Sequence, residues 1–205
     1  MGGYMTTVGI YGGSFDPIHE GHSMVARKLL DSGVVDEILF VPAAISPHKR
    51  EAAPASGDDR LKMIQLALAG IENVTVSDIE IQRGGTSYTV DTITILSEEE
   101  AKSESPRALR LIIGGDAAKT FHTWKDPETI AALAPPIVVR RGNGKLVIPD
   151  SPVHDILVEG TTDIVATDIS STEVRRRLRA GERCDDLVDD DVLEYIYNNN
   201  LYIER

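Results

Sequence analysis

The sequence GGSFDPIHEGH, residues 12–22, directly follows an apolar run, VGIY, at residues 8–11. This order predicts a buried strand, a glycine turn and the start of a helix. Gly12 and Gly13 allow a sharp turn and let a ligand approach backbone N–H groups without a Cβ in the way. His19 and His22 lie three residues apart, so a helix places both on one face. Because free N–H groups and the helix dipole favour negative charge there, the stretch predicts a phosphate site.

Outward from this stretch, apolar runs alternate with helical patterns along the chain. We predict strands at residues 6–11, 38–41, 74–76, 109–113, 137–139 and 164–166. We predict helices at residues 20–32, from Asp58 or Asp59 onward, and at 89–96, 126–133, 171–180 and 190–199, with residues 143–162 mostly irregular. This alternation indicates an α/β fold, here a Rossmann-like parallel sheet with helices on both faces. We expect a single domain over residues 1–205, with a helical C-terminal portion from about residue 170.

The composition limits the range of functions. The 205 residues carry a formal net charge of −12, which argues against nucleic-acid binding as the main activity but allows a local cationic pocket for a nucleotide. The one cysteine, Cys184, excludes an intrachain disulfide and a thiolate metal cluster, and we expect its side chain to be buried or half-buried. No secretion signal opens the chain, and no apolar run approaches the roughly 20 residues of a membrane helix. We therefore expect a soluble, cytoplasmic protein, and the oligomeric state is left open.

Two loops carry groups suited to a nucleotide. Residues 47–50, PHKR, form a basic loop in which His48 and Lys49 are candidates for phosphate contacts, with a solvated surface loop as the alternative. The strand at residues 109–113 runs into Gly114, Gly115 and Asp116. A carboxylate at this place can accept the hydroxyls of a ribose, or it can cap the next helix.

Residues 169–175, ISSTEVR, combine a helix cap with groups that a cap does not need. Ser170 and Glu173 have the spacing of a capping box. Ser171, Thr172 and Arg175 add two hydroxyls and a guanidinium to a helix N-terminus, which suits a triphosphate. We therefore predict a second phosphate-binding segment here.

The first stretch resembles the GG(T/S)FDPxHxGH signature of the nicotinate mononucleotide adenylyltransferases, in the nucleotidylyltransferase superfamily. The shorter form HxGH is less specific, because class I aminoacyl-tRNA synthetases and cytidylyltransferases carry it as well. Five further segments match the same family and extend the resemblance over most of the chain: residues 41–49, 83–92, 112–116, 121–125 and 169–175.

The resemblance implies adenylyl transfer from ATP to nicotinate mononucleotide, which yields nicotinate adenine dinucleotide and pyrophosphate. A phosphate monoester dianion is already nucleophilic, so in-line attack needs neither a general base nor a covalent intermediate. The catalytic candidates are then His19, His22, Lys49 and Arg175, because donors and cations around the phosphates stabilise the growing charge. We expect Mg²⁺ to arrive with ATP, and the sequence has no ligand cluster for a resident metal.

The resemblance also divides the site residues between the two substrates. It implies that Trp124, the only tryptophan, stacks on the pyridine ring and that the turn at residues 83–92 receives the ring carboxylate. A core role for Trp124, and helix capping by Ser87 and Thr89, are the alternatives. The candidates for ATP are Gly12, Gly13, Ser14, Phe15, His19, His22, Ile169, Ser171, Thr172 and Arg175. The candidates for the mononucleotide are Ser14, Lys49, Thr89, Gly114, Asp116 and Trp124.

Other functions fit parts of the sequence less well. Pantetheine-phosphate adenylyltransferases usually have threonine at the position of His19. Glycerol- and choline-phosphate cytidylyltransferases have an RTxGIST-type motif, and the Arg-Thr pair is missing before residues 169–172. A nucleotide-binding sensor without chemistry does not need complete phosphate motifs, and nothing repetitive or surface-apolar in the sequence indicates a purely structural protein.

Overall fold

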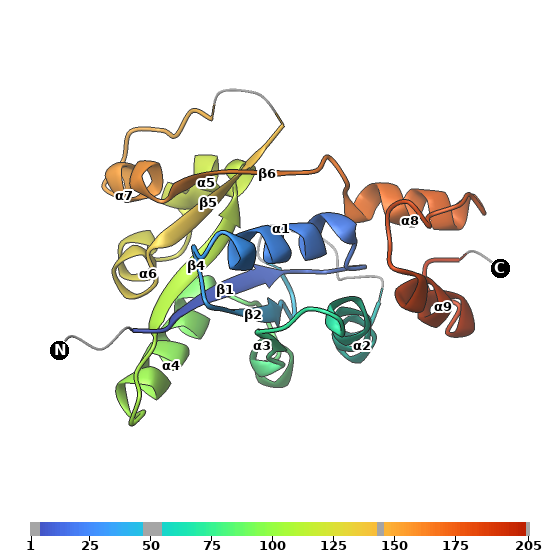
Figure 1. Ribbon diagram of the computed structural model, residues 1–205, viewed down its shortest axis with the longest axis horizontal. Helices are drawn as coiled ribbons and strands as arrows, with labels where there is room; N and C mark the ends of the chain where they lie inside the picture. Colours follow the sequence, from blue (N-terminus) through green and yellow to red (C-terminus); the bar gives the residue numbers. More distant parts are fainter. Residues whose placement is uncertain (1–4, 47–54, 143–145, 204–205) are drawn as a thin grey trace.

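A six-stranded parallel sheet forms the centre of the computed structural model, which describes residues 5–46, 55–142 and 146–203 (Figure 1). The strand order is β3-β2-β1-β4-β5-β6. In the middle of the sheet, Ile10 of β1 lies between Leu39 of β2 and Leu111 of β4. The strands are β1 (Thr7–Gly13), β2 (Glu37–Pro42), β3 (Val74–Val76), β4 (Ala108–Gly114), β5 (Pro136–Arg141) and β6 (Thr161–Ala166).

Helices connect the strands and cover both faces of the sheet. In Figure 1, α1 lies over the sheet, while α8 and α9 lie at the end towards which β1 points. The helices before the fourth strand are α1 (Glu20–Asp31), α2 (Gly57–Leu68), α3 (Ile79–Arg83) and α4 (Thr89–Ala101). The later ones are α5 (Gly115–Thr120), the 3₁₀ helix η1 (Phe121–Thr123), α6 (Pro127–Leu133), α7 (His154–Glu159), α8 (Ser171–Arg179) and α9 (Asp190–Asn198).

Successive side chains of a strand point to opposite faces, and this alternation builds two apolar cores. On β4, Ile112 packs into the core that contains α1, α2, α8 and α9. Its neighbours Leu111 and Ile113 pack into the other core, with α4, α5, α6 and α7. Because both faces are covered, the strands read in the sequence as continuous apolar runs.

The structure confirms the predicted Rossmann-like parallel sheet, with all six expected strands and a helical C-terminal portion. Cys184 is buried, as expected. Four short helices, α3, α5, η1 and α7, were not predicted, and α7 lies in the part expected to be irregular. The predicted cap at Asp58 or Asp59 is wrong, because Ser56 caps α2 and its side chain accepts from the backbone N–H of Asp59. No helix in the described ranges is long and apolar enough to cross a lipid bilayer.

The topology sets the place of a site. β1 pairs with β2 on one side and with β4 on the other, so the connections after β1 and after β3 lead to opposite sides of the first strand. In an open α/β sheet, ligands bind in the crevice beyond the carboxyl ends of the strands at this reversal. The stretch GGSFDPIHEGH lies at this position. The predicted turn at Gly12 and Gly13 is wrong, because both residues pair with β2 as the end of β1 and the chain turns only after them.

Candidate active site

Two histidines meet at the first turn of α1. His19 is the N-cap residue, with extended backbone, and His22 lies within the first turn. The backbone N–H of His19 donates to Nδ1 of His22 at 3.3 Å, and the two rings stack with their centroids 3.7 Å apart. The prediction that both imidazoles share one face is therefore confirmed.

The residues around this histidine pair leave little room for other side chains. Phe15 is buried beneath it, and its ring meets His22 edge-on with centroids 5.0 Å apart. A Cβ on Gly13 would lie 2.9 Å from the Phe15 ring, and one on Gly21 would lie 2.9 Å from Thr167 Oγ1. A larger residue at either position would therefore require a neighbouring side chain to move.

Two cavities open near the carboxyl ends of β1 and β4. The first, here called the tryptophan cavity, has a volume of about 240 Å³ and is lined by residues of β1, β4, α3 and α4 together with Trp124. The second, here called the histidine cavity, has a volume of about 280 Å³ and contains the histidine pair. Tyr11 and Gly114 line both cavities, so the two are adjacent.

The histidine cavity brings together groups from the two ends of the chain. Besides the histidine pair, its lining includes two predicted ATP contacts, Ile169 and Ser171. Asp116, predicted for the mononucleotide, also lines this cavity. The side chain of Asp116 is exposed and pairs with Lys119 at 3.0 Å, so it does not cap α5 as the alternative supposed.

Arg141, which we did not predict as a site residue, brings a positive charge to the histidine cavity. Arg141, at the end of β5, lines this cavity, and its guanidinium lies 3.7 Å from Asp116 and 3.5 Å from Asp168. Burial, and secondarily the charge of Arg141, lower the pKa of His19 from 6.5 to about 4. His19 is therefore neutral at pH 7, and it can act there as a hydrogen-bond donor or acceptor.

The N-terminus of α8 docks onto the loop after β1. Ser170 caps the helix, and its hydroxyl accepts from the backbone N–H of Glu173 at 3.2 Å. Ser171 donates to the carbonyl of Pro17 at 2.9 Å, and Arg175 donates to the carbonyl of Asp16 at 2.7 Å. The two predicted phosphate segments, which are about 150 residues apart in sequence, are thus in direct contact. The predicted ATP contact Thr172 lies 3.5 Å from an Arg175 nitrogen.

The tryptophan cavity gathers the other predicted contacts. Its lining includes Gly12, Gly13, Ser14, Thr89, Gly114 and Trp124. The indole of Trp124 is half-buried and packs on Phe121, with ring centroids 5.1 Å apart. Capping of α4 by Ser87 is wrong, because the Ser87 hydroxyl accepts from the backbone N–H of Ala44 at 2.9 Å. Thr89 is the first residue of α4 and does not cap it.

Of the predicted site residues in the described ranges, Phe15, Thr172 and Arg175 line neither cavity. Phe15 packs into the core and lines neither cavity, so the structure places it as a support for His22. Lys49 lies outside the described residues, together with the neighbouring His48.

Comparison with known proteins places the chain in a family. Residues 10–177 match the model of the cytidylyltransferase-like family. The chain is 38% identical over 201 residues to the probable nicotinate-nucleotide adenylyltransferase of Halalkalibacterium halodurans, covering 97% of this chain and 92% of that protein. It is 34% identical to the protein of the same name from Bordetella avium, covering 97% of this chain and 98% of that protein. The chain belongs to the nicotinate-nucleotide adenylyltransferase family.

A solved structure of another protein has the same fold as this chain. The nicotinic acid mononucleotide adenylyltransferase of Plasmodium falciparum, complexed with NaAD, matches with a TM-score of 0.74 at 20% identity. The match covers 96% of this chain and 97% of that one. The resemblance predicted from GGSFDPIHEGH and the later segments is thus confirmed at the level of the family.

In this member of the nicotinate-nucleotide adenylyltransferase family, the structure shows two residues near the site that we did not predict from the sequence, Arg60 and Arg141. Arg60 is buried, and it donates to the carbonyls of Ser14 and Ala43 at 2.9 and 2.7 Å. It thereby ties the loop after β1 to the loop after β2. The sequence gives no signal for this role, because an arginine within the run DDRLK is typical of an exposed helix face. Arg141 could have been found from the sequence, because it lies just after the predicted strand at residues 137–139, where site residues are expected.

Proposed function

We propose that this chain transfers the adenylyl group of ATP to nicotinate mononucleotide, releasing nicotinate adenine dinucleotide and pyrophosphate, and so acts in the biosynthesis of NAD. The membership of the nicotinate-nucleotide adenylyltransferase family supports this reaction. The observation that carries it is the pair of adjacent cavities, which share Tyr11 and Gly114.

Each cavity suits one substrate. The tryptophan cavity has an aromatic side chain for a pyridine ring, and the first turn of α4 offers free N–H groups to a carboxylate. The histidine cavity has imidazoles at a helix N-terminus, a setting that favours a polyphosphate. With the substrates so placed, the 5′-phosphate of the mononucleotide meets the α-phosphorus of ATP near the border of the two cavities.

The chemistry then requires positioning and charge stabilisation. The 5′-phosphate attacks the α-phosphorus in line, the bond to the bridging oxygen breaks, and pyrophosphate leaves. His19 and His22 donate to phosphate oxygens as negative charge moves towards the leaving group. Arg175 uses one nitrogen for the carbonyl of Asp16, and its guanidinium has further N–H groups for a phosphate. Lys49 is proposed as a further phosphate contact on sequence grounds.

Asp116 is proposed to contact a ribose next to the border. It follows Gly114, which lines both cavities, by two residues. A ribose hydroxyl would compete with Lys119 and Arg141 for this carboxylate. Its oxygens together have room for more than one donor.

Mg²⁺ is proposed to enter as part of the MgATP substrate. Among the described residues, no group of three or more His, Cys, Asp or Glu side chains could hold a metal ion. Phosphate oxygens and waters are the ligands that Mg²⁺ commonly keeps in nucleotide sites.

A substrate panel tests the proposal. Pyrophosphate release is measured with MgATP and, in turn, nicotinate mononucleotide, nicotinamide mononucleotide and phosphopantetheine, and with CTP and glycerol phosphate. We expect the highest kcat/KM for ATP with nicotinate mononucleotide, and a nicotinate adenine dinucleotide product by mass spectrometry. A higher kcat/KM with phosphopantetheine or with CTP would contradict the proposal, as would ATP binding without pyrophosphate release from any pair.

A further inference from the structure

The tryptophan cavity has one charged side chain among the described residues that line it, namely Glu80 of α3. The other lining residues are apolar, aromatic, glycine or hydroxyl-bearing. Glu80 is 7% exposed, and a carboxylate so buried usually has a charged or strongly polar partner. The cavity thus offers a fixed negative charge to whatever part of a ligand enters it.

The partners of Glu80 leave this charge only partly compensated. Its Oε1 accepts from the hydroxyl of Thr92 at 2.6 Å. Arg83 reaches the group only through that hydroxyl, to which its Nη2 donates at 3.1 Å. Within the described part of the chain, Glu80 forms no ion pair. The site therefore favours a cation that can approach from the cavity.

The ring of nicotinate mononucleotide is such a cation, because its nitrogen is bonded to ribose and the ring is a pyridinium. We propose that Glu80 is the counter-charge that selects the pyridinium ring in the tryptophan cavity, facing it together with the indole of Trp124. An aromatic face also attracts a cation, so the two groups act in the same direction. This inference rests on the proposed function and assigns a specificity residue within it.

The arrangement separates Glu80 from the place proposed for the ring carboxylate. Thr89 starts α4, and Thr92 lies three residues further along the same face of the helix. Glu80 is bound to Thr92, so it lies about one turn from the free N–H groups at the start of the helix. The negative and positive ends of the zwitterionic ring can therefore meet different partners.

The charge of the ring can be removed without changing its size. In 1,4-dihydronicotinate mononucleotide the ring nitrogen is neutral, and the carboxylate, ribose and phosphate are retained. We compare kcat/KM for the two forms with saturating MgATP, using pyrophosphate release. The wild type is expected to prefer the oxidised form by about tenfold or more, which is the size of effect that an opposite charge a few ångströms away has on an ionisation.

Two variants separate charge from packing. Glu80→Gln keeps the shape and the acceptor for Thr92, and we expect it to lose most of the preference for the oxidised form. Thr92→Val removes the hydroxyl but keeps the carboxylate, and we expect it to retain the preference. Thermal melting of both variants shows whether they are folded.

Three results would overturn the inference. These are a wild type that treats both ring forms alike, a Glu80→Gln variant that loses kcat/KM equally for both, and a Thr92→Val variant that loses as much preference as Glu80→Gln. The first measurement needs no variant, so a folding defect does not remove the test. A wild type that releases no pyrophosphate with either form would instead contradict the proposed function, which keeps the two failures apart.

Discussion

Among single residues, His19 links the site to stability. Burial holds its pKa at about 4 in the folded chain, against 6.5 for an exposed histidine. Between these values the unfolded chain binds the proton more readily, so the free energy of unfolding falls as the pH falls. From about pH 7.5 to about pH 5, we expect this group to lower it by about 2 kcal/mol. Urea unfolding at both pH values measures this decrease in the free energy of unfolding, and we expect it to be about 2 kcal/mol smaller in His19→Gln. A pH dependence equal to that of the wild type in this variant would show that His19 is not its source.

The histidine pair is expected to act mainly on turnover. His19→Ala or His22→Ala removes a donor aimed at charge that grows in the transition state, so kcat should fall by about 10²-fold with little change in the KM for ATP. Steady-state kinetics measures this split, and far-UV circular dichroism should be unchanged. His154→Ala, on α7, is the matched control and should keep the wild-type kcat. Turnover near that of the wild type in both site variants would exclude the catalytic role.

Substitution of Trp124 tests whether its indole stacks on the pyridine ring of the substrate or serves as a core side chain. Its indole is half-buried and lines the tryptophan cavity. Loss of a stacked ring costs about 1–3 kcal/mol, so Trp124→Ala should raise the KM for nicotinate mononucleotide by roughly tenfold and leave the KM for ATP unchanged. Melting temperature is measured beside both KM values. A large drop in melting temperature, with both KM values changed together, would show a core role instead.

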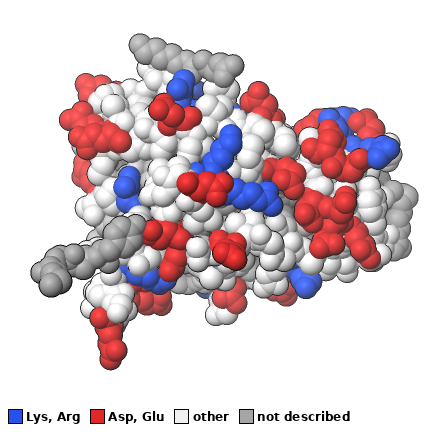
Figure 2. Space-filling model, in the orientation of Figure 1, with Lys and Arg blue, Asp and Glu red and all other residues white. Residues whose placement is uncertain are grey.

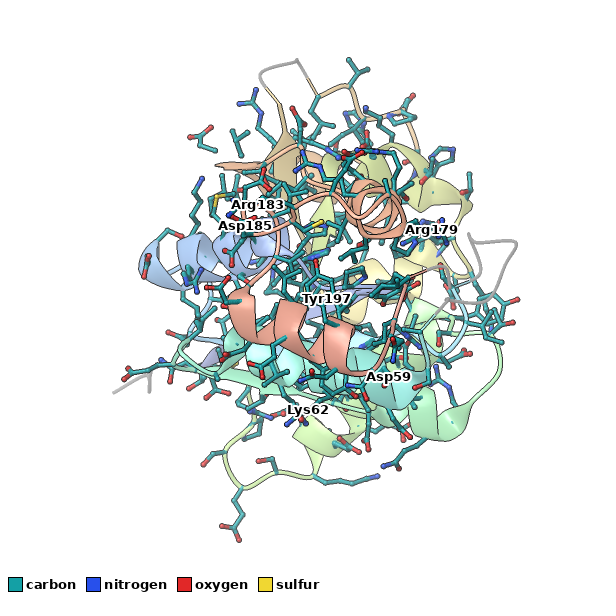
Figure 3. The ribbon with its side chains drawn as sticks, turned by 90° about the vertical axis from the view of Figure 1, so that its right-hand side faces the viewer. Asp59, Lys62, Arg179, Arg183, Asp185 and Tyr197 are labelled. Carbon is teal, nitrogen blue, oxygen red and sulfur yellow. The ribbon has the colours of Figure 1, made fainter. Side chains whose placement is uncertain are left out.

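At the scale of elements, the C-terminal segment supports the loop after β1. Figure 3 shows α9 between Asp59 and Lys62 of α2 on one side and Arg179 of α8 on the other. Beyond α9, the hydroxyl of Tyr202 donates to Oδ1 of Asp16 at 2.6 Å, and Ala55 N–H donates to the same oxygen at 3.3 Å. Both Tyr202 and Asp16 are buried. The last residues of the fold thus hold an aspartate of GGSFDPIHEGH.

This contact predicts a measurable loss of stability. Tyr202→Phe removes only the hydroxyl and leaves the buried Asp16 carboxylate with one donor fewer, so the free energy of unfolding should fall by about 1.5–3 kcal/mol. Tyr197→Phe is the matched control, because Tyr197 is 50% exposed on the adjacent helix α9. Its effect should stay within about 0.5 kcal/mol. Equal urea midpoints for the two variants would show that the Tyr202 hydroxyl contributes nothing.

The elements also show where sequence reasoning succeeds and where it stops. Long apolar runs and the histidine spacing report local preferences, so the sheet and the histidine pair could be predicted. The missed helices α3, α5, η1 and α7 have 5, 6, 3 and 6 residues, too few to show a periodic pattern. The start of α2 was misplaced because Ser56, Asp58 and Asp59 are all good caps, and the structure uses the first.

Contacts between segments far apart in the chain could not be predicted from the sequence, for a different reason. Arg60 becomes buried because two loops turn their carbonyls towards it, and Glu80 because α4 covers it with Thr92. Tyr202 and Asp16 are 186 residues apart. Such pairings depend on the completed fold, and no local pattern of residue types indicates them.

At the scale of the whole molecule, the surface and the site differ in charge. Figure 2 shows acidic side chains spread over much of the visible face, in keeping with the net charge of −12. Arg141 and the histidine pair instead line one cavity, and Arg175 lies beside it, where the two predicted phosphate segments meet. The fold thus concentrates donors for an anionic substrate at one place on an acidic protein.

The fate of the α-phosphate tests the central claim most directly. The protein is incubated with MgATP labelled at the α-phosphorus and with nicotinate mononucleotide. The labelled products are then separated, and their amounts are compared with the amount of pyrophosphate formed. We predict that the label appears in nicotinate adenine dinucleotide, with one pyrophosphate released for each dinucleotide. Label recovered in free AMP or ADP, or retained in ATP while the protein binds both ligands, would contradict adenylyl transfer between the two cavities.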